Sequence, residues 1–377
     1  MKVVVAVDSF KGSLSSIEAG QAIKEGIVKV NEKAEVIVRP IADGGEGTTE
    51  ALVEGLGGKW VTLPVKGPLM TTVHATYGIV EESQTAILEM AAAAGITLVK
   101  PEERNPLEAT TYGVGEMVAD ALKRGCRNFI IGIGGSATND CGIGMLMALG
   151  YEFLDKYHQS VALGARGLKD ICFIEDKHVF PELRECHFRV ACDVNNPLYG
   201  KEGATYIYGP QKGVTEEMKE ELDQVIERFA KCSSHYTEND YSQAKGAGAA
   251  GGMGYAFLSY LKAELLPGIS LVLETIQLEE TLKGADYVVT GEGQLDRQTT
   301  MGKVPSGVAR LAKKQGLPVI AFAGALSKEA YLCNEVGIKA FFAILPRVMT
   351  LEEAMEKEMA KTNLKNTVEQ VFRLLYL

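Results

Sequence analysis

Two patterns of hydrophobic and polar positions alternate near both ends of the chain. Short, fully apolar runs are followed by segments in which apolar residues recur every three or four positions. In residues 15–30, for example, Ile17, Ile23 and Ile27 share one helical face, and charged residues fall on the other. This pattern is typical of strands that alternate with amphipathic helices. Because the strands are apolar throughout, it predicts an α/β fold with a parallel sheet covered on both faces.

The end regions contribute five such strands, two from the N-terminal part and three from the C-terminal part. The expected strands are residues 3–7, 36–41, 287–290, 318–323 and 340–345. The expected helices are residues 15–30, 48–56, 305–315, 329–336 and 351–375. A split of two plus three suits the strand order 2-1-3-4-5, in which the first and third strands are neighbours.

The middle of the chain has a different pattern. It begins with three extended segments that form a meander, at residues 60–65, 73–80 and 85–89. Further strands are expected at 128–133, 187–192 and 205–208, with helices at 111–123, 142–149 and 215–232. We therefore expect one domain built from residues 1–60 plus 284–377, interrupted by an inserted mixed α/β domain at residues 61–283.

Composition narrows the class of protein. At 377 residues the chain is long enough for two cores, and 46% hydrophobic with 23% charged residues is usual for a globular protein. A net charge of −10 argues against a nucleic-acid partner. The longest apolar stretch, residues 90–99, is too short to cross a membrane. Seven cysteines without a C-x-x-C pair, and a start without a signal peptide, predict reduced thiols and a cytoplasmic location.

Acidic residues and glycines follow three of the expected strands. These runs are residues 8–12, 43–47 and 291–296. Glycines let main-chain N–H groups approach an anion, while carboxylates take a cation such as Mg²⁺. In an open parallel sheet, ligands bind beyond the carboxyl ends of the strands, where the strand order reverses. The predicted order would therefore gather six charged residues in one site: Asp8, Lys11, Asp43, Glu46, Glu292 and Asp296.

A second glycine-rich run, residues 134–140, follows an expected strand and opens an expected helix. It is either an anion site at a helix N-terminus or an ordinary turn capped by Ser136 or Thr138. Residues 132–137 also fit a loose G-x-G-x-x-A fingerprint, with Asp155 at a suitable distance for a nicotinamide dinucleotide. Asp140 weakens the dinucleotide interpretation, because an anion would meet its charge in the first turn.

Other segments carry single candidates. Asp193 follows an expected strand and is either a general base or metal ligand, or the cap of an Asx turn before proline. Lys212 and Lys303 lie on turns, where isolated lysines are usually solvated. Residues 246–251 match G-x-G-x-x-G, but no strand precedes them, so a flexible or close-packed glycine loop is expected. Motifs of P-loop kinases, protein kinases, serine hydrolases and zinc peptidases are absent.

Together these runs resemble the type I glycerate kinase family. The matching segments occur in order along nearly the whole chain: residues 8–13, 40–48, 132–140, 191–198, 209–213, 246–252 and 290–296. One departure is Cys141, where the family pattern leads us to expect glycine, and we expect it to alter only local backbone freedom.

The resemblance implies a flavodoxin-like domain interrupted by a second α/β domain. It also implies ATP-dependent phosphorylation of D-glycerate with Mg²⁺, with 2-phosphoglycerate favoured over 3-phosphoglycerate as the product. The alternatives are a nicotinamide-dependent dehydrogenase of a small hydroxy acid and a non-enzymatic organic-acid sensor. Whether the chain forms a homo-oligomer is left open.

The candidate site residues divide by role. For catalysis we expect Asp193 as the base that accepts the glycerate hydroxyl proton, Lys11 as a charge that attracts an anionic group, and Asp8 beside it. Asp43 and Glu292 are the expected metal ligands. The expected nucleotide-binding residues are Gly134, Gly135, Ser136, Thr138, Lys212, Gly291, Gly293 and Asp296.

Overall fold

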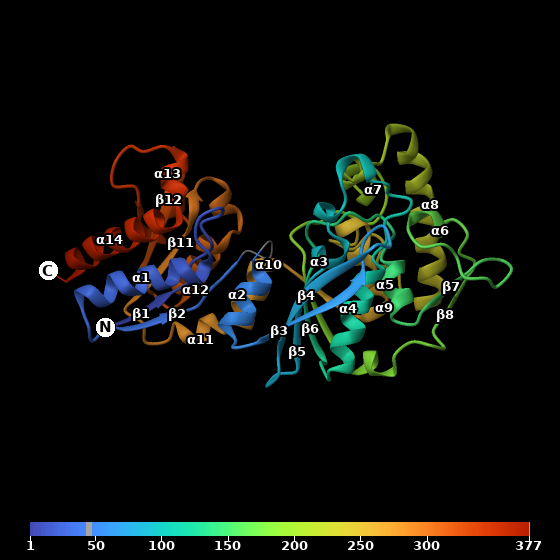
Figure 1. Cartoon of the computed structure of the whole chain (residues 1–377), viewed down its shortest axis with the longest axis horizontal. Coiled ribbons are helices and arrows are strands. Elements are labelled where there is room, and N and C mark those ends of the chain that lie inside the picture. The colour runs from blue at the N-terminus through green and yellow to red at the C-terminus, as the bar shows by residue number, and fades with distance from the viewer. Residues whose placement is uncertain (43–46, 377) are drawn as a thin grey trace. The chain divides into compact units, whose positions relative to one another are not determined.

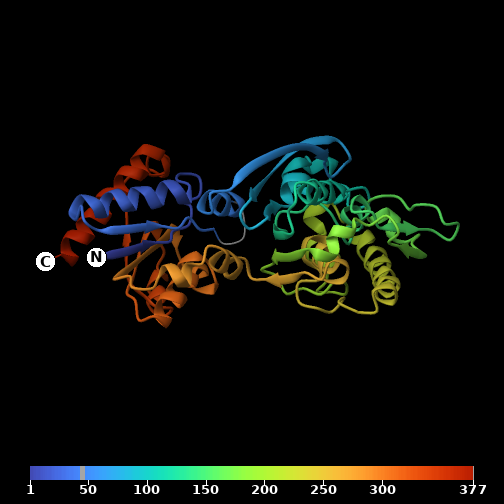
Figure 2. The ribbon, with the colours of Figure 1, turned by 90° about the horizontal axis from the view of Figure 1, so that it is seen from below.

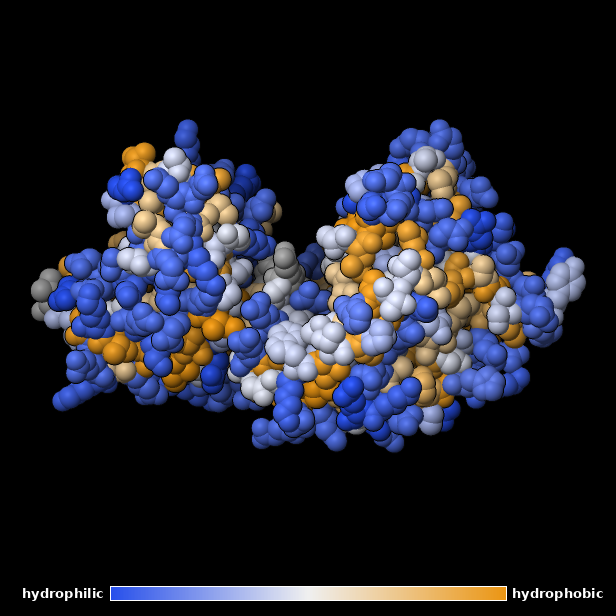
Figure 3. Space-filling model, viewed as in Figure 1, coloured by the Kyte–Doolittle hydropathy of each residue, from blue (hydrophilic) through white to orange (hydrophobic). Residues whose placement is uncertain are grey.

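The computed structural model describes residues 1–42 and 47–376, which form two compact units (Figure 1). Unit 1 comprises Met1–Gly57 and Ile269–Leu377, and unit 2 comprises Gly58–Gly268. Within the described ranges, no helix is both long and apolar enough to cross a membrane. Hydrophilic residues cover most of the face seen in Figure 3, and hydrophobic residues reach it in small groups.

Unit 1 is built on a five-stranded parallel sheet. Its strands are β1 (Lys2–Val5), β2 (Glu35–Val38), β11 (Tyr287–Leu295), β12 (Val319–Leu326) and β13 (Ile338–Ala343). Their order is β2-β1-β11-β12-β13, and every neighbouring pair is parallel. The predicted α/β class with a parallel sheet is confirmed. The direction of the strand order reverses between β1 and β11, the position at which open parallel sheets bind ligands.

Helices cover both faces of this sheet (Figure 2). The helices of this unit are α1 (Ser16–Val30), α2 (Thr48–Gly55), α10 (Gly268–Thr275), α11 (Leu278–Thr281), α12 (Val304–Lys314), α13 (Leu351–Met355) and α14 (Lys357–Leu375), of which α1, α12 and α14 contact the strands. A capping box starts α1, because Glu18 N donates to Ser15 Oγ and Ser15 N donates to the Glu18 carboxylate. Ile23 and Ile27 of α1 join Val368 of α14 in the apolar core on one face of the sheet.

Unit 2 contains a six-stranded mixed sheet in the order β10-β9-β6-β5-β4-β3. Its strands are β3 (Lys59–Lys66), β4 (Thr72–Val80), β5 (Thr85–Glu89), β6 (Asn128–Gly132), β9 (His187–Ala191) and β10 (Glu264–Leu266). The first three form the antiparallel meander, and the other pairs are parallel. A separate antiparallel pair consists of β7 (Glu152–Leu154) and β8 (Phe173–Glu175).

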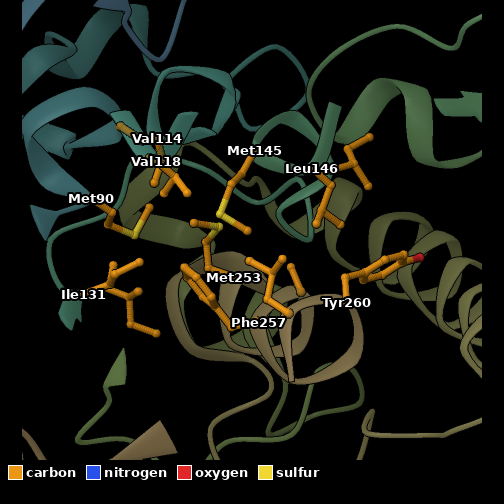
Figure 4. Packing of buried hydrophobic residues seen from close by; sticks show 14 of the residues in the cluster. Met90, Val114, Val118, Ile131, Met145, Leu146, Met253, Phe257 and Tyr260 are labelled. Atoms are coloured by element: carbon orange, nitrogen blue, oxygen red, sulfur yellow. The ribbon is translucent and has the colours of Figure 1, made fainter. Parts of the chain in front are cut away.

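The core of unit 2 is formed by side chains from helices and the sheet that point toward one another. Figure 4 shows Met145, Met253 and Phe257 together with Val114 and Val118. The helices are α3 (Ala91–Ala94), α4 (Tyr112–Lys123), α5 (Ile143–Ala148), α6 (Ala165–Leu168), α7 (Ala204–Tyr208), α8 (Glu216–Thr237) and α9 (Met253–Leu261).

Two expected elements are wrong in type. Residues 205–208 form a turn of helix α7 rather than a strand, although their aromatic and β-branched residues favour strands. Tertiary contacts decide the outcome, because the hydroxyl of the buried Thr205 accepts a hydrogen bond from Asn139. The expected helix at 329–336 is instead a short 3-10 helix, η7 (Ala330–Asn334).

Candidate active site

A cavity of about 390 Å³ lies at the carboxyl ends of the unit 1 strands. Asp8 and Lys11, which follow β1, share its lining with Glu292 and Asp296 of the β11 segment and with Lys303 before α12. These five residues come from segments almost 300 positions apart in the sequence, and the switch between β1 and β11 brings them together. The sequence predicted this gathering for four of them, while Asp43 and Glu46 lie outside the described residues.

The strand β11 continues through the glycine–acid run, so the expected strand end at residue 290 is wrong. Pairing with β1 ends at Val289, but pairing with β12 continues to Leu295. A side chain at Gly291 would place its Cβ 2.1 Å from the main-chain oxygen of Phe322. Gly291 therefore allows close contact between two strands and does not line the cavity, whereas Gly293 does.

Glu292 is a buried charge in this cavity, with 6% of its surface exposed, and Asp8 is similarly enclosed at 4%. Its Oε1 accepts a 2.5 Å hydrogen bond from the Thr299 hydroxyl, and its Oε2 lies 3.7 Å from the ammonium of Lys303. Both contacts fix the position of the carboxylate. Thr299 N in turn donates to Asp296 Oδ1 at 3.1 Å, which ties the two acids to one 3-10 turn, η6 (Gln298–Met301).

The donor set of the cavity suits a hard cation. Mg²⁺ takes oxygen ligands and needs only one or two carboxylates when it also binds phosphate. Asp8 is buried and its Oδ1 accepts from Ser9 N at 2.7 Å. In the described part of the chain, no group of three or more His, Cys, Asp or Glu residues could hold a metal by itself. A cation here would therefore depend on phosphate oxygens, or on residues outside the described ranges, for its remaining ligands.

In unit 2, the glycine-rich segment after β6 leads to the helix expected at 142–149, which is α5 (Ile143–Ala148). Residues 134–140 form the loop that precedes this helix. Gly134 and Gly135 are exposed, and the following residues through Asp140 are buried. The anion site expected at this segment stays a prediction, and the exposed Gly134 and Gly135 are the part of the loop that an anion could reach.

Lys212 lies under this loop, and 2% of its surface is exposed. Its ammonium donates to the Ser136 hydroxyl and to the Thr138 main-chain oxygen, each at 2.7 Å. Burial lowers the pKa of Lys212 to about 7, and the nearby Asp140 carboxylate opposes that shift. Most lysines are solvated, and Lys212 is an exception. Its two hydrogen bonds hold the loop at the side that faces the core.

Asp140 points into the core of unit 2 and clamps two helices. Its Oδ2 accepts from Thr111 N at 2.8 Å and from the Thr111 hydroxyl at 2.9 Å, next to the start of α4. Its Oδ1 accepts from Gly142 N at 3.1 Å, at the start of α5. Burial raises the pKa of Asp140, and these hydrogen bonds to its oxygens oppose the rise.

The loop also contains polar atoms that are not satisfied. Among the described residues, the Thr138 hydroxyl and Asn139 Oδ1 are buried without a hydrogen-bond partner. Each such group costs roughly 1–3 kcal/mol in a folded protein. A bound water or a polar group of a ligand could satisfy these atoms.

Residues 246–252 are a close-packed glycine loop. A Cβ at Gly251 would lie 2.0 Å from the Thr138 oxygen, and one at Gly248 would lie 2.1 Å from the Pro197 oxygen. Cys141 N donates to the Gly251 oxygen at 2.9 Å. Cys141 itself has a φ of 52°, a left-handed conformation that favours the glycine expected at this position.

Asp193 lies two residues beyond the end of β9 and is exposed. Its Oδ1 accepts a 2.9 Å hydrogen bond from Gly268 N, so its carboxylate is positioned by main chain from another segment. The expected set of site residues thus falls into two groups: one in the cavity of unit 1, and one in unit 2 with Asp193, Lys212 and the loop at 134–138.

The model of the Glycerate kinase family matches residues 3–376. Several curated glycerate kinases are similar over most of their length. The chain belongs to the glycerate kinase family. The glycerate kinase of Halalkalibacterium halodurans is 44% identical over 355 residues, which are 94% of this chain and 93% of that protein. The glycerate 2-kinase of Escherichia coli is 45% identical over 358 residues, again 94% and 93% of the two chains.

A solved structure agrees with these relatives. A crystal structure from Salmonella typhimurium LT2, assigned to glycerate kinase 2, has a TM-score of 0.91 and 43% sequence identity. It covers 100% of this chain, which in turn covers 98% of it. The resemblance drawn from the motifs is therefore confirmed, and the protein is an enzyme of the glycerate kinase family, a phosphotransferase with an alcohol group as acceptor.

The dinucleotide fingerprint does not fit this glycerate kinase. No helix follows β6 directly, and Asp155 lies in a turn where its Oδ1 accepts from Tyr157 N and Gln159 N. Sequence reasoning gave too little weight to Lys303, which lines the cavity beside Glu292. Its place directly after Gly302, close to the acid run, was the available signal.

Proposed function

We propose that this enzyme transfers the γ-phosphoryl group of ATP to a hydroxyl of D-glycerate and releases 2-phosphoglycerate. The observation that carries the proposal is the family match, which spans residues 3–376 and so includes the site residues of both units. The choice of the 2-position is supported by the name of the Escherichia coli relative, glycerate 2-kinase.

The unit 1 cavity has the charges that phosphoryl transfer requires. Such reactions depend on positioning and on neutralising phosphate charge rather than on covalent chemistry. Lys11 and Lys303 supply positive charge, while Glu292, with Asp43 outside the described residues, is the proposed ligand of Mg²⁺. Mg²⁺ held there would supply positive charge that offsets the charge of the phosphates. The Thr299 hydroxyl and the Lys303 ammonium hold the Glu292 carboxylate in position for that task.

Asp193 is the proposed general base. The attacking glycerate hydroxyl must lose its proton, and an aspartate within hydrogen-bond distance could accept it. Bases of this kind typically contribute about 10²–10⁴-fold to the rate. The Gly268 N–H bond supports the role, because it orients the Asp193 carboxylate while leaving the residue exposed.

The loop at 134–138 is the proposed site for an anionic group of a substrate. Exposed glycines offer main-chain N–H groups, and Lys212 supplies positive charge from below. Lys11 could play the same part in unit 1 as a compact point charge.

A coupled assay of ADP release tests the proposal. We expect release that depends on D-glycerate and Mg²⁺, with no oxidation or reduction of NAD(P). Phosphorus NMR then identifies the product, since a phosphate on C2 couples to a single carbon-bound proton and one on C3 couples to two. Turnover of NAD(P) instead of ATP would favour the dehydrogenase, and glycerate binding without turnover of either would favour a sensor.

A further inference from the structure

The unit 1 cavity also has an apolar side that the charge chemistry does not use. It is lined by Phe10 and by residues that follow β13: Ile344, Leu345, Leu351, Ala354, Met355 and Ala360. Apart from Phe10, these all fall within residues 344–360, which we call the C-terminal strap. The strap includes α13 and the first turn of α14.

The strap keeps a defined shape while leaving apolar side chains exposed. A capping box begins α13, since Glu353 N donates to the Thr350 hydroxyl and Thr350 N donates to the Glu353 carboxylate. Despite this order, Leu351 remains 75% exposed and Met355 36% exposed. Large apolar groups at the lining of a cavity are a favourable surface for a ligand with an apolar part.

The strap lies next to the charged residues. A Cβ at Gly12 would lie 2.5 Å from Cε of Met355, so Met355 packs directly on the turn that carries Lys11. The Gly12 φ of 78° and the absence of a side chain there permit this contact. One ligand of moderate size could therefore contact Lys11 at one end and the strap at the other.

The two substrates of the proposed reaction differ in what they can bury. Every carbon of glycerate carries oxygen, so it has no apolar part for the strap. A nucleoside triphosphate has both a flat, weakly polar base and a chain of phosphates. The cavity volume of about 390 Å³ falls within the usual range of small-molecule sites.

We propose that this cavity is the nucleotide site and that the C-terminal strap binds the base, with the phosphates toward Lys11, Glu292 and Lys303. The inference rests on the proposed ATP-dependent function. Gly293 and Gly324 also line the cavity and add no side chains to it.

The test places a large side chain at the apolar side of the cavity and measures MgADP binding in the absence of turnover. In the full-length enzyme, Ala354→Trp should weaken MgADP binding by about tenfold or more, the size usual for a changed apolar pocket. Leu351→Asp should act in the same direction, and its exposure means that the fold tolerates it. Magnesium tripolyphosphate, which has no base, should bind wild type and both variants equally. The matched control is Met359→Trp, an exposed methionine outside the cavity lining, which should leave MgADP binding unchanged.

The outcomes separate this inference from the proposed function. If the wild type shows no D-glycerate-dependent turnover but Ala354→Trp still weakens MgADP binding, the nucleotide site stands and the proposed reaction fails. If turnover is normal and neither variant changes the MgADP affinity or the KM for ATP, the strap does not bind the base. A rise confined to the KM for D-glycerate would also overturn the inference, because the cavity would then hold the acceptor.

Discussion

The ammonium of Lys212 donates a 2.7 Å hydrogen bond to the main-chain oxygen of Thr138, inside the core of unit 2. Burial lowers the pKa of this lysine to about 7, against the opposing effect of Asp140. The charge that supports the loop at 134–138 therefore changes over the pH range in which enzymes are usually assayed.

This shift predicts a pH-dependent KM. If the loop binds an anionic group, the KM of that substrate should rise between pH 7 and 9 as Lys212 loses its proton. Lys212→Met should show a high KM that no longer varies with pH in this range. The exposed Lys201→Met is the control and should follow the wild type. Identical pH profiles of both KM values in wild type and Lys212→Met would remove Lys212 from substrate binding.

The same lysine predicts a change in stability with pH. Its pKa is about 7 in the folded chain and 10.5 ordinarily, so between these values the unfolded chain binds the extra proton. The contribution of Lys212 to the free energy of unfolding should therefore increase as the pH rises from 7 to 10.5. Urea titrations of wild type and Lys212→Met at several pH values give the difference. We expect the wild type to become more stable relative to Lys212→Met as the pH rises. A difference that stays constant with pH would contradict the lowered pKa of Lys212.

Asp193→Asn should lower kcat by about 10²–10⁴-fold while changing the KM for D-glycerate little. The amide cannot accept the hydroxyl proton, but its oxygen can still accept from Gly268 N, so the loop should stay in place. Asp155→Asn is the control, because Asp155 only orders a hairpin turn. Steady-state kinetics and thermal unfolding are measured together. A lower Tm with normal kcat on the folded fraction would show that Asp193 only supports its loop.

The sequence predicted the sheet of unit 1 because its signals are local. Each strand is an apolar run, and parallel pairing then follows from the alternation with helices. The same local signals misled at residues 205–208, where a contact between Thr205 and Asn139 outweighs strand propensity. This contact joins residues that are 66 positions apart, and no periodic pattern in the sequence indicates it.

Only the part of the candidate site that lies at the carboxyl ends of the unit 1 strands could be predicted from the sequence. The sequence brought Asp8, Glu292 and Asp296 together, since the switch point of a parallel sheet follows from topology. The close contact between Gly291 and β12 could not be predicted, because the sequence does not distinguish a glycine needed for packing from one needed for ligand binding. The burial of Lys212 could not be predicted either, because the sequence of its turn does not differ from that of a turn with a solvated lysine.

Gly251→Ala should destabilise unit 2 through a steric clash. Gly251 has a φ of 68°, and the new Cβ would lie 2.0 Å from the Thr138 oxygen. Gly125→Ala is the matched control, because Gly125 also has a positive φ but open space around it. The left-handed conformation alone costs about 1–2 kcal/mol, and overpacking typically adds about 1–3 kcal/mol. Thermal unfolding should show a clearly larger loss of Tm for Gly251→Ala, and equal losses would mean that the loop yields without strain.

Glu292→Gln should raise the Mg²⁺ concentration needed for half-maximal activity and lower kcat by roughly 10²–10³-fold, the loss typical when one preorganised charge interaction is removed from a reacting centre. The glutamine oxygen can still accept from the Thr299 hydroxyl, so the turn at 296–299 should remain folded. Glu280→Gln, on an exposed face of unit 1, is the control.

Asp43→Asn tests the other proposed ligand in the same Mg²⁺ titration and should also lower kcat with the fold intact. The two carboxylates are proposed to serve one cation, so the double variant should lose little more than the worse of the two single variants. Fully multiplied losses would indicate separate roles. Near-normal turnover of Asp43→Asn at saturating Mg²⁺ would remove that residue from the metal site and leave Glu292 to act through Lys303 and the phosphates alone.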